Sequence, residues 1–229
     1  MALMPRLRQL MRRPSSASTV GARRPTSAAR RGDTLHEDAL RSMLSDDPNN
    51  ERAFAALAEI VRRRAADSSQ DDDPLTAEGA ETSEREHAAD LAVWALGEEL
   101  AGNPRAWYPL IEVARLSVRD DHEGTLRRLR TAAERDPSGR ALVEALALLR
   151  GADAPVDALG LGVGYWHPKD HDPEVARHLV LAAIEAGRPL EAKQHIGALD
   201  LYRSQKDVAE LREELVRLAA QAEQTIPGT

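Results

Sequence analysis

The sequence contains no cysteine, and only 3% of its 229 residues are aromatic. Without cysteine there is no disulfide framework, no thiolate metal ligand and no cysteine nucleophile. Alanine and leucine carry most of the apolar content. Small side chains let helices pack closely, whereas sheets favour β-branched and aromatic residues. We therefore expect an all-α fold that is held together without covalent cross-links.

Long apolar runs are also missing. None approaches the roughly 18 residues that a membrane-spanning helix needs. Near the N-terminus, Arg6, Arg8 and Arg12 interrupt any stretch that would serve as a secretory signal. We therefore expect no transmembrane segment and a cytoplasmic location.

Acidic residues are absent from the first 31 positions, which hold eight arginines. All 38 acidic residues follow Arg31, together with the other 23 basic residues. Such charge segregation is typical of a disordered arm, here predicted for residues 1–32. A solvated tail without a dedicated ligand is the favoured interpretation. The alternatives are weak contact of residues 1–31 with anionic lipid or nucleic-acid phosphate, contact with the acidic body, or a cleaved organellar leader.

An Asp or Asn followed by Pro recurs along the rest of the chain. These dipeptides predict helix starts, because the Asx oxygen caps free N–H groups and Pro is tolerated in the first helical turn. Their prolines are separated by 56, 33 and 36 residues. We interpret the longer first interval as an acidic loop, residues 66–84, inserted between two helices. The four pairs are Asp47-Pro48, Asn103-Pro104, Asp136-Pro137 and Asp172-Pro173.

Between two of these pairs, the segment 103–137 shows two amphipathic helical patterns. Each has one apolar face, which needs a neighbouring helix to bury it. The first pattern has Trp107, Leu110, Ile111 and Ala114 on its face, and the second has Leu126, Leu129 and Ala133.

The segment and its period of about 34 residues resemble the tetratricopeptide repeat family. The resemblance implies that residues 33–225 form stacked antiparallel helix pairs in a superhelix, with a groove lined by the first helix of each pair. It also implies that a peptide or partner protein binds there without a cofactor. Two residues depart from the family pattern: Ile111 replaces a small residue, and Pro109 predicts a kink. The implied groove residues are Arg105, Tyr108, Glu112, Arg115, Glu174 and Arg177.

Two further segments lie on either side of this one. Residues 88–100 predict a helix with Ala88, Leu91, Ala92, Ala95, Leu96 and Leu100 on its buried face. Further along, Gly160, Gly162 and Gly164 each disfavour a helix by about 1 kcal/mol relative to Ala. We expect a frayed or irregular helix there and no nucleotide-binding loop, because the spacing matches neither phosphate-binding motif.

The cluster with most potential for chemistry is residues 165–172, which hold His167, Asp170, His171 and Asp172. Two imidazoles and two carboxylates are able to ligate a metal or transfer protons. We favour a polar connector, because two prolines place the segment in a loop. The sequence therefore predicts a protein-interaction scaffold, with no enzymatic activity, catalytic residue, cofactor or metal site. The runner-up is a nucleic-acid- or membrane-associated protein tethered by its Arg-rich arm.

Overall fold

The structure is a computed structural model that describes residues 27–68 and 78–225. The chain divides into two compact units, Met1–Leu35 and His36–Thr229, and the boundary lies within helix α1 (Ser27–Asp46). Throughout the described residues the secondary structure is helical, without a strand. None of the helices in these ranges is both long and apolar enough to cross a membrane. The all-α fold is as predicted.

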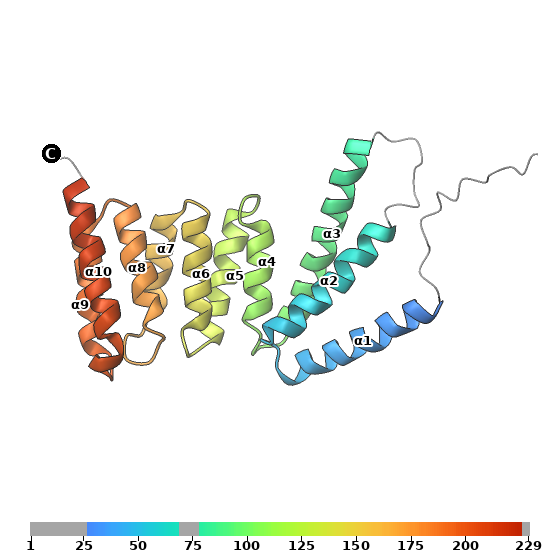
Figure 1. The fold of residues 1–229 in the computed structure, drawn as a ribbon, viewed down its shortest axis with the longest axis horizontal. Helices are drawn as coiled ribbons and strands as arrows, with labels where there is room; N and C mark the ends of the chain where they lie inside the picture. The colour runs from blue at the N-terminus through green and yellow to red at the C-terminus, as the bar shows by residue number, and fades with distance from the viewer. Residues whose placement is uncertain (1–26, 69–77, 226–229) are drawn as a thin grey trace, which may run out of the picture. The chain divides into compact units, whose positions relative to one another are not determined.

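In the second unit, successive helices pack side by side (Figure 1). Contacts also join alternate helices, namely α4 with α6, α6 with α8, α8 with α10 and α5 with α7. The helices follow one another along the unit as a row of layers. The helices after α1 are α2 (Glu51–Ser68), α3 (Glu78–Ala101), α4 (Tyr108–Ser117), α5 (His122–Arg135), α6 (Arg140–Gly151), α7 (Pro155–Tyr165), α8 (Glu174–Glu185), α9 (Pro189–Ala198) and α10 (Gln205–Thr225).

The hydrophobic core of this unit runs along the row in two clusters. One joins α1, α2 and α3, and the other extends from α3 to α10. The predicted face of α4 is buried as expected, with Trp107, Leu110, Ile111 and Ala114 all in the core. In α5, Leu129 and Ala133 are buried while Leu126 packs against them at the edge. A helix with a single apolar stripe buries that stripe, so its buried face can be predicted from the sequence.

The Asx-Pro pairs introduce turns rather than helices in three of four cases. Helix α8 begins directly after Pro173, but α2, α4 and α6 begin three or four residues beyond their prolines. The Asp136 carboxylate illustrates the reason, because it accepts hydrogen bonds from Ser138 N at 3.1 Å and from Ala141 N at 2.7 Å. The Asx side chain first closes a turn and then caps the helix that follows. Pro109 consequently lies in the first turn of α4, and the predicted kink is wrong.

One arginine side chain makes three hydrogen bonds to the turn between α3 and α4. The Arg135 guanidinium on α5 donates from Nη1 to the carbonyl oxygens of Ala101 at 2.9 Å, Asn103 at 3.1 Å and Ala106 at 2.8 Å. Carbonyls at the end of a helix lack intrahelical partners and need such donors. Arg135 therefore ties this turn to α5.

Two predicted boundaries change. The loop predicted for residues 66–84 is narrower, because residues 66–68 belong to α2 and 78–84 to α3. Ala and Glu in these margins have high helix propensity, which favours the extension of both helices. Residues 69–77 lie outside the described part. Of the predicted disordered arm, residues 27–32 belong to α1, and residues 1–26 are likewise outside it.

The buried face of α3 agrees with the predicted one only in part, at Leu96 and at half-buried Leu100. Ala89, Val93 and Leu96 are buried, whereas Leu91 is exposed. Gly97 explains this orientation, since a Cβ built there would lie 2.3 Å from Cγ2 of Val113 on α4. The close approach of the two helices turns the glycine side of α3 inward. Apolar residues occur on several sides of α3, so periodicity alone does not identify its buried face in full.

Helix α7 is regular, so the prediction of a frayed helix is wrong. Its Gly162 is buried, and a Cβ there would lie 2.3 Å from Cδ2 of Leu179 on α8. The absence of a side chain lets Leu179 fill the space above the glycine. The packing of α7 against α8 therefore offsets the low helix propensity of glycine.

Candidate functional site

The six predicted groove residues fall into two groups in the structure. In the first, Arg105 is exposed in the turn before α4, where its carbonyl accepts a hydrogen bond from Nδ2 of Asn49 at 2.8 Å. On α4, Arg115 lies 3.4 Å from Glu112 and also reaches Glu144 on α6, at 3.5 Å. The charged side chains of α4 thus extend to α6.

Tyr108 opens α4 at the centre of an aromatic cluster. Its ring meets Phe54 and Trp107 edge-on, with centroid separations of 5.5 and 5.8 Å. Burial raises the pKa of the Tyr108 hydroxyl, and the carboxylate of Glu112, which also accepts its hydrogen bond, raises that pKa further. The chain has seven Phe, Trp and Tyr residues, and three of them meet here. This concentration matters because aromatic side chains dominate the energetics of interfaces.

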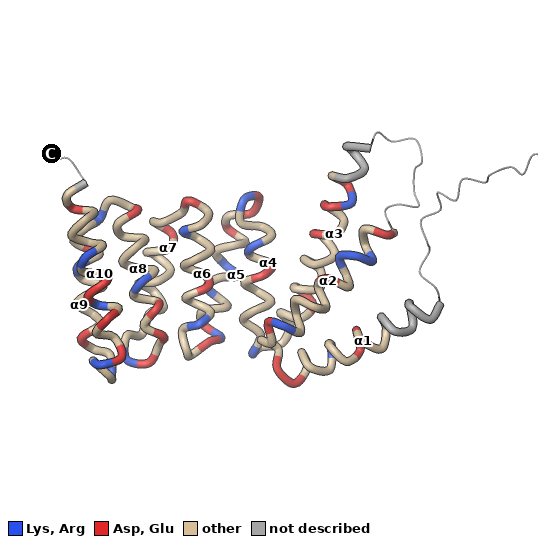
Figure 2. The backbone as a smooth tube through the Cα atoms, viewed as in Figure 1, with Lys and Arg blue, Asp and Glu red and all other residues tan. Residues whose placement is uncertain are grey.

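The second group lies on α8 and continues the same polar surface. Arg177 pairs with Glu174 at 2.7 Å and with Glu214 on α10. These two carboxylates hold the pKa of Arg177 above its usual range, and Arg177 in turn lowers the pKa of Glu214. Figure 2 shows acidic and basic residues interleaved over these helices. We call the charged residues on α4, α6, α8 and α10 the ladder: Glu112, Arg115, Glu144, Glu174, Arg177 and Glu214.

A pocket of about 130 Å³ connects the two groups. Trp107 and Val143 supply its apolar lining, while Glu144 and Glu174 belong to both the pocket and the ladder. Its walls come from α2, the turn before α4, α6, and the start of α8. The full lining is Glu51, Trp107, Arg140, Val143, Glu144, Asp172 and Glu174.

Arg140 crosses the pocket wall. Its guanidinium carbon lies 5.7 Å from the centroid of the Trp107 ring, and its Nη2 lies 2.9 Å from Oε1 of Glu51. Arg140 and Glu144 were not predicted from the sequence, because the glycines of the next helix made the pattern of this segment look irregular. The detectable signal was the spacing: Arg140 and Glu144 are four residues apart at the start of α6, as are Tyr108 and Glu112 on α4.

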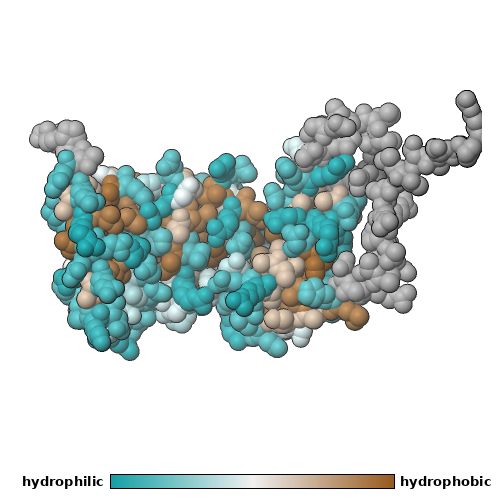
Figure 3. Space-filling view, in the orientation of Figure 1, coloured by the Kyte–Doolittle hydropathy of each residue, from teal (hydrophilic) through white to brown (hydrophobic). Residues whose placement is uncertain are grey.

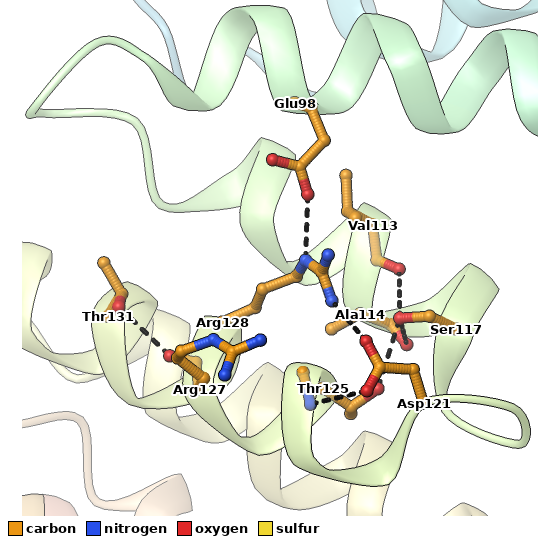
Figure 4. Close-up of polar contacts among 10 residues, drawn as sticks. Glu98, Val113, Ala114, Ser117, Asp121, Thr125, Arg127, Arg128 and Thr131 are labelled. Atoms are coloured by element: carbon orange, nitrogen blue, oxygen red, sulfur yellow. Dashed lines mark hydrogen bonds and ion pairs between the residues drawn. The ribbon is translucent and has the colours of Figure 1, made fainter.

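A second charged cluster lies outside the ladder, between α3 and α5. Arg128 on α5 lies between Glu98 of α3, at 2.9 Å, and Asp121, at 3.4 Å (Figure 4). Asp121 also caps α5 by accepting a hydrogen bond from Gly124 N at 2.8 Å, and this bond is the main reason why its pKa is lowered. The cluster ties α3 to the start of α5, which is a structural task.

The loop with His167 and His171 packs against the turn before α6. The two imidazole rings meet edge-on at 4.9 Å, and His171 is buried against Gly139. Burial lowers the pKa of His171, and nearby His167 lowers it further. Within residues 27–68 and 78–225, no group of three or more His, Cys, Asp or Glu side chains is arranged to hold a metal ion. The loop joins two helices, and Asp172 caps α8 by accepting from Glu174 N at 2.9 Å.

Exposed large apolar side chains occur on several of the described helices. Hydrophilic residues cover much of the face drawn in Figure 3, with apolar patches between the helices. Single exposed apolar residues are normal on folded proteins. The larger ones on α3 to α10 include Leu91, Val156, Val163, Leu190 and Val216.

Comparison with known proteins gives no family for this chain. It matches no family model, no curated protein and no solved structure. The function is therefore argued from the pocket, the ladder and the helix packing.

Proposed function

We propose that the chain is a protein-interaction scaffold, without an enzymatic role, that binds a segment of another protein across the ladder and its pocket. The observation that carries the proposal is the continuity of this surface. Arg115 joins α4 to α6, the pocket joins α6 to α8, and Arg177 joins α8 to α10. A segment lying across these helices meets regularly spaced charges and one aromatic-walled pocket.

The arrangement of the helices supports the finer proposal of a superhelix similar to tetratricopeptide repeats. Consecutive helices pack in pairs, and the first helices of successive pairs also contact each other from α4 to α10. In a stacked array, each layer buries the apolar face of the next, and the exposed edges of the first helices form a shared surface. The cytoplasmic location favoured by the sequence belongs to the same proposal.

The composition of the surface is also suited to protein recognition. Aromatic residues and arginine are enriched at interface hot spots, because they supply large contact areas and several hydrogen-bond donors. Tyr108, Arg115 and Arg177 meet this description, and each is already held in place by partners within the chain. Preorganised side chains lose less entropy when a partner binds.

The proposal is tested by site-specific photo-crosslinking with the full-length protein in extracts of the cells that produce it. A photoreactive p-benzoylphenylalanine is placed at position 115, on the ladder, or as a matched control at position 119 or 130. Arg115, Arg119 and Arg130 are all exposed arginines, so the three substitutions remove the same charge.

We expect one discrete protein to form an adduct from position 115 and neither control position to capture it. Adduct formation of equal strength from all three positions would mean that capture is nonspecific. No adduct from position 115 would remove the ladder from consideration as a binding surface.

A further inference from the structure

We propose that the pocket beside Trp107 accepts an arginine or lysine side chain from the bound segment. This inference rests on the proposed function and identifies the chemistry of the partner at one point of the surface. Three features of the pocket support it: its size, the cation already present there, and the balance of charge around it.

The size of the pocket limits what it holds. Sites for drug-sized ligands and cofactors usually measure about 300–1,000 Å³. A pocket of about 130 Å³ is too small for a nucleotide or a drug-sized molecule. One side chain projecting from an extended segment suits it.

The chain itself demonstrates the chemistry of the pocket wall. Arg140 places a guanidinium over the face of Trp107 and pairs with Glu51. A cation over an indole face is favourable, because the ring carries negative charge density on its face. The Trp107 ring is buried in the core and cannot turn away, so it presents a fixed surface. The wall is therefore complementary to a guanidinium or ammonium group.

Arg140 is held loosely enough to give way. Its side chain is 62% exposed and that of Glu51 is 50% exposed, so solvent screens the pair strongly. Exposed ion pairs contribute about 0–1 kcal/mol. A cation from the partner can therefore replace Arg140 on Trp107 at small cost, while Arg140 turns into solvent.

The charge around the pocket selects the sign of the occupant. Four carboxylates line it, those of Glu51, Glu144, Asp172 and Glu174, against the single guanidinium of Arg140. Arg115 approaches Glu144 only to 3.5 Å. Arg177 neutralises Glu174 more closely, at 2.7 Å. The remaining negative charge attracts a cation and repels the carboxylate of an acidic segment.

The experiment titrates two synthetic peptides into the isotopically labelled full-length protein. The probes are acetyl-Gly-Arg-Leu-Arg-Gly-amide and its acidic counterpart, acetyl-Gly-Glu-Leu-Glu-Gly-amide. The readout is the indole N–H resonance of Trp107, which is assigned by comparison with the Trp94→Phe and Trp166→Phe variants. We expect the Arg peptide to shift this resonance saturably and the Glu peptide to leave it in place.

Two variants with opposite expected effects sharpen the test. Glu144→Gln should weaken binding of the Arg peptide by roughly two- to fivefold, the range of a single exposed charge pair. Arg140→Ala should strengthen it, because a competing cation is removed. The matched controls are Glu191→Gln and Arg188→Ala, which make the same charge changes in an exposed ion pair at the start of α9. We expect these controls to leave the affinity unchanged.

Several outcomes would overturn the inference. One is binding of the Glu peptide that Arg140→Ala abolishes, which would make the pocket an anion site. Another is the absence of any Trp107 response to either peptide up to their solubility limit. In both cases the crosslinking from position 115 remains a separate measurement, so the proposed scaffold function stands or fails independently.

Discussion

Arg128 and Arg140 form two sites with nearly the same geometry and opposite exposure. Each guanidinium lies 5.7 Å from a tryptophan centroid and 2.9 Å from a glutamate oxygen. At Arg128 the arginine side chain is 17% exposed, while its ring, Trp94, is 37% exposed. At Arg140 the side chain is 62% exposed, while Trp107 is only 6% exposed.

The difference in exposure shows which side chain of each Arg–Trp pair is buried in the fold. Arg128 is enclosed by α3 and α5 and fastens them together, so its tryptophan serves as an outer cover. Trp107 is enclosed by the core, so in this pair the ring is fixed by packing and Arg140 serves as the cover. A cover that is mostly solvated is replaceable, and this property distinguishes a binding wall from a structural clamp.

The largest expected effect separates the two rings. Trp107→Ala should lower the free energy of unfolding by about 3–5 kcal/mol, because it leaves a cavity in the core. Trp94→Ala should lower it by about 1 kcal/mol, since much of that ring is already in solvent. Urea denaturation followed by far-UV circular dichroism measures both. Equal losses for the two variants would contradict the distinction.

The next effect separates the two arginines. Arg128→Ala should lower the free energy of unfolding by about 1–3 kcal/mol, because it removes packing between helices and leaves Glu98 and Asp121 without their cation. Arg127→Ala is the matched control on the same helix, at an exposed position. Denaturation of both variants under identical conditions tests this. A loss for Arg128→Ala no greater than that of the control would refute the clamp.

Acid should distinguish the two regions as well. Burial is the main cause that lowers the pKa of His171, His178 and His195 below the usual 6.5. The unfolded chain then binds protons more readily than the folded chain, so the stabilisation is complete above about pH 6.5 and is lost as pH falls below it. The groups around them are His167, Asp136 and Asp170 for His171, Arg150, Glu174, Arg177 and Glu185 for His178, and Glu191 for His195.

All three histidines lie between the end of α7 and the end of α9, away from the helices α3 and α5 that Arg128 joins. Amide hydrogen exchange at a neutral and a mildly acidic pH, corrected for intrinsic rates, should show protection falling first in residues 166–199. Helices α3 to α5 around Arg128 should retain theirs longer. His178→Asn should reduce the difference. Simultaneous loss of protection in both regions would show that these histidines do not control it.

The smallest expected effect on stability is that of Arg140→Ala. It should change the free energy of unfolding by no more than about 0.5 kcal/mol, as is usual for exposed side chains. The contrast with Arg128→Ala is the informative quantity, since the two substitutions are chemically identical. A loss for Arg140→Ala as large as that for Arg128→Ala would make Arg140 a second clamp and weaken its assignment as a replaceable cover.

Much of the fold follows from local pattern, and its exceptions have specific causes. The faces of α4 and α5 were predictable because each helix has one apolar stripe. The face of α3 was not, since Leu91 and Trp94 are as apolar as the residues actually buried. Gly162 weakens α7 by its own propensity, and the reason that it is tolerated lies on another helix, in Leu179. Contacts of this kind have no local signature.

The candidate site was predictable only in part for the same reason. The resemblance to a repeat suggested Glu112, Arg115, Glu174 and Arg177, which belong to the ladder. It also suggested Tyr108, which lies beside the ladder and donates a hydrogen bond to Glu112. The predicted role of Arg105 rested on a helix start at Asn103-Pro104, but α4 begins at Tyr108. The pocket itself is assembled from four separate segments of chain, so it cannot be predicted from any single stretch of sequence.

Arg135 has a consequence for how this protein varies over evolution. Its guanidinium binds carbonyl oxygens of the turn before α4, and a carbonyl is the same whatever residue carries it. Substitutions in that turn that keep its path should therefore be tolerated, while Lys in place of Arg135 would lose the planar, multidentate donor set. Among related sequences, we expect an invariant arginine facing a turn whose exposed positions, such as Pro104 and Arg105, vary.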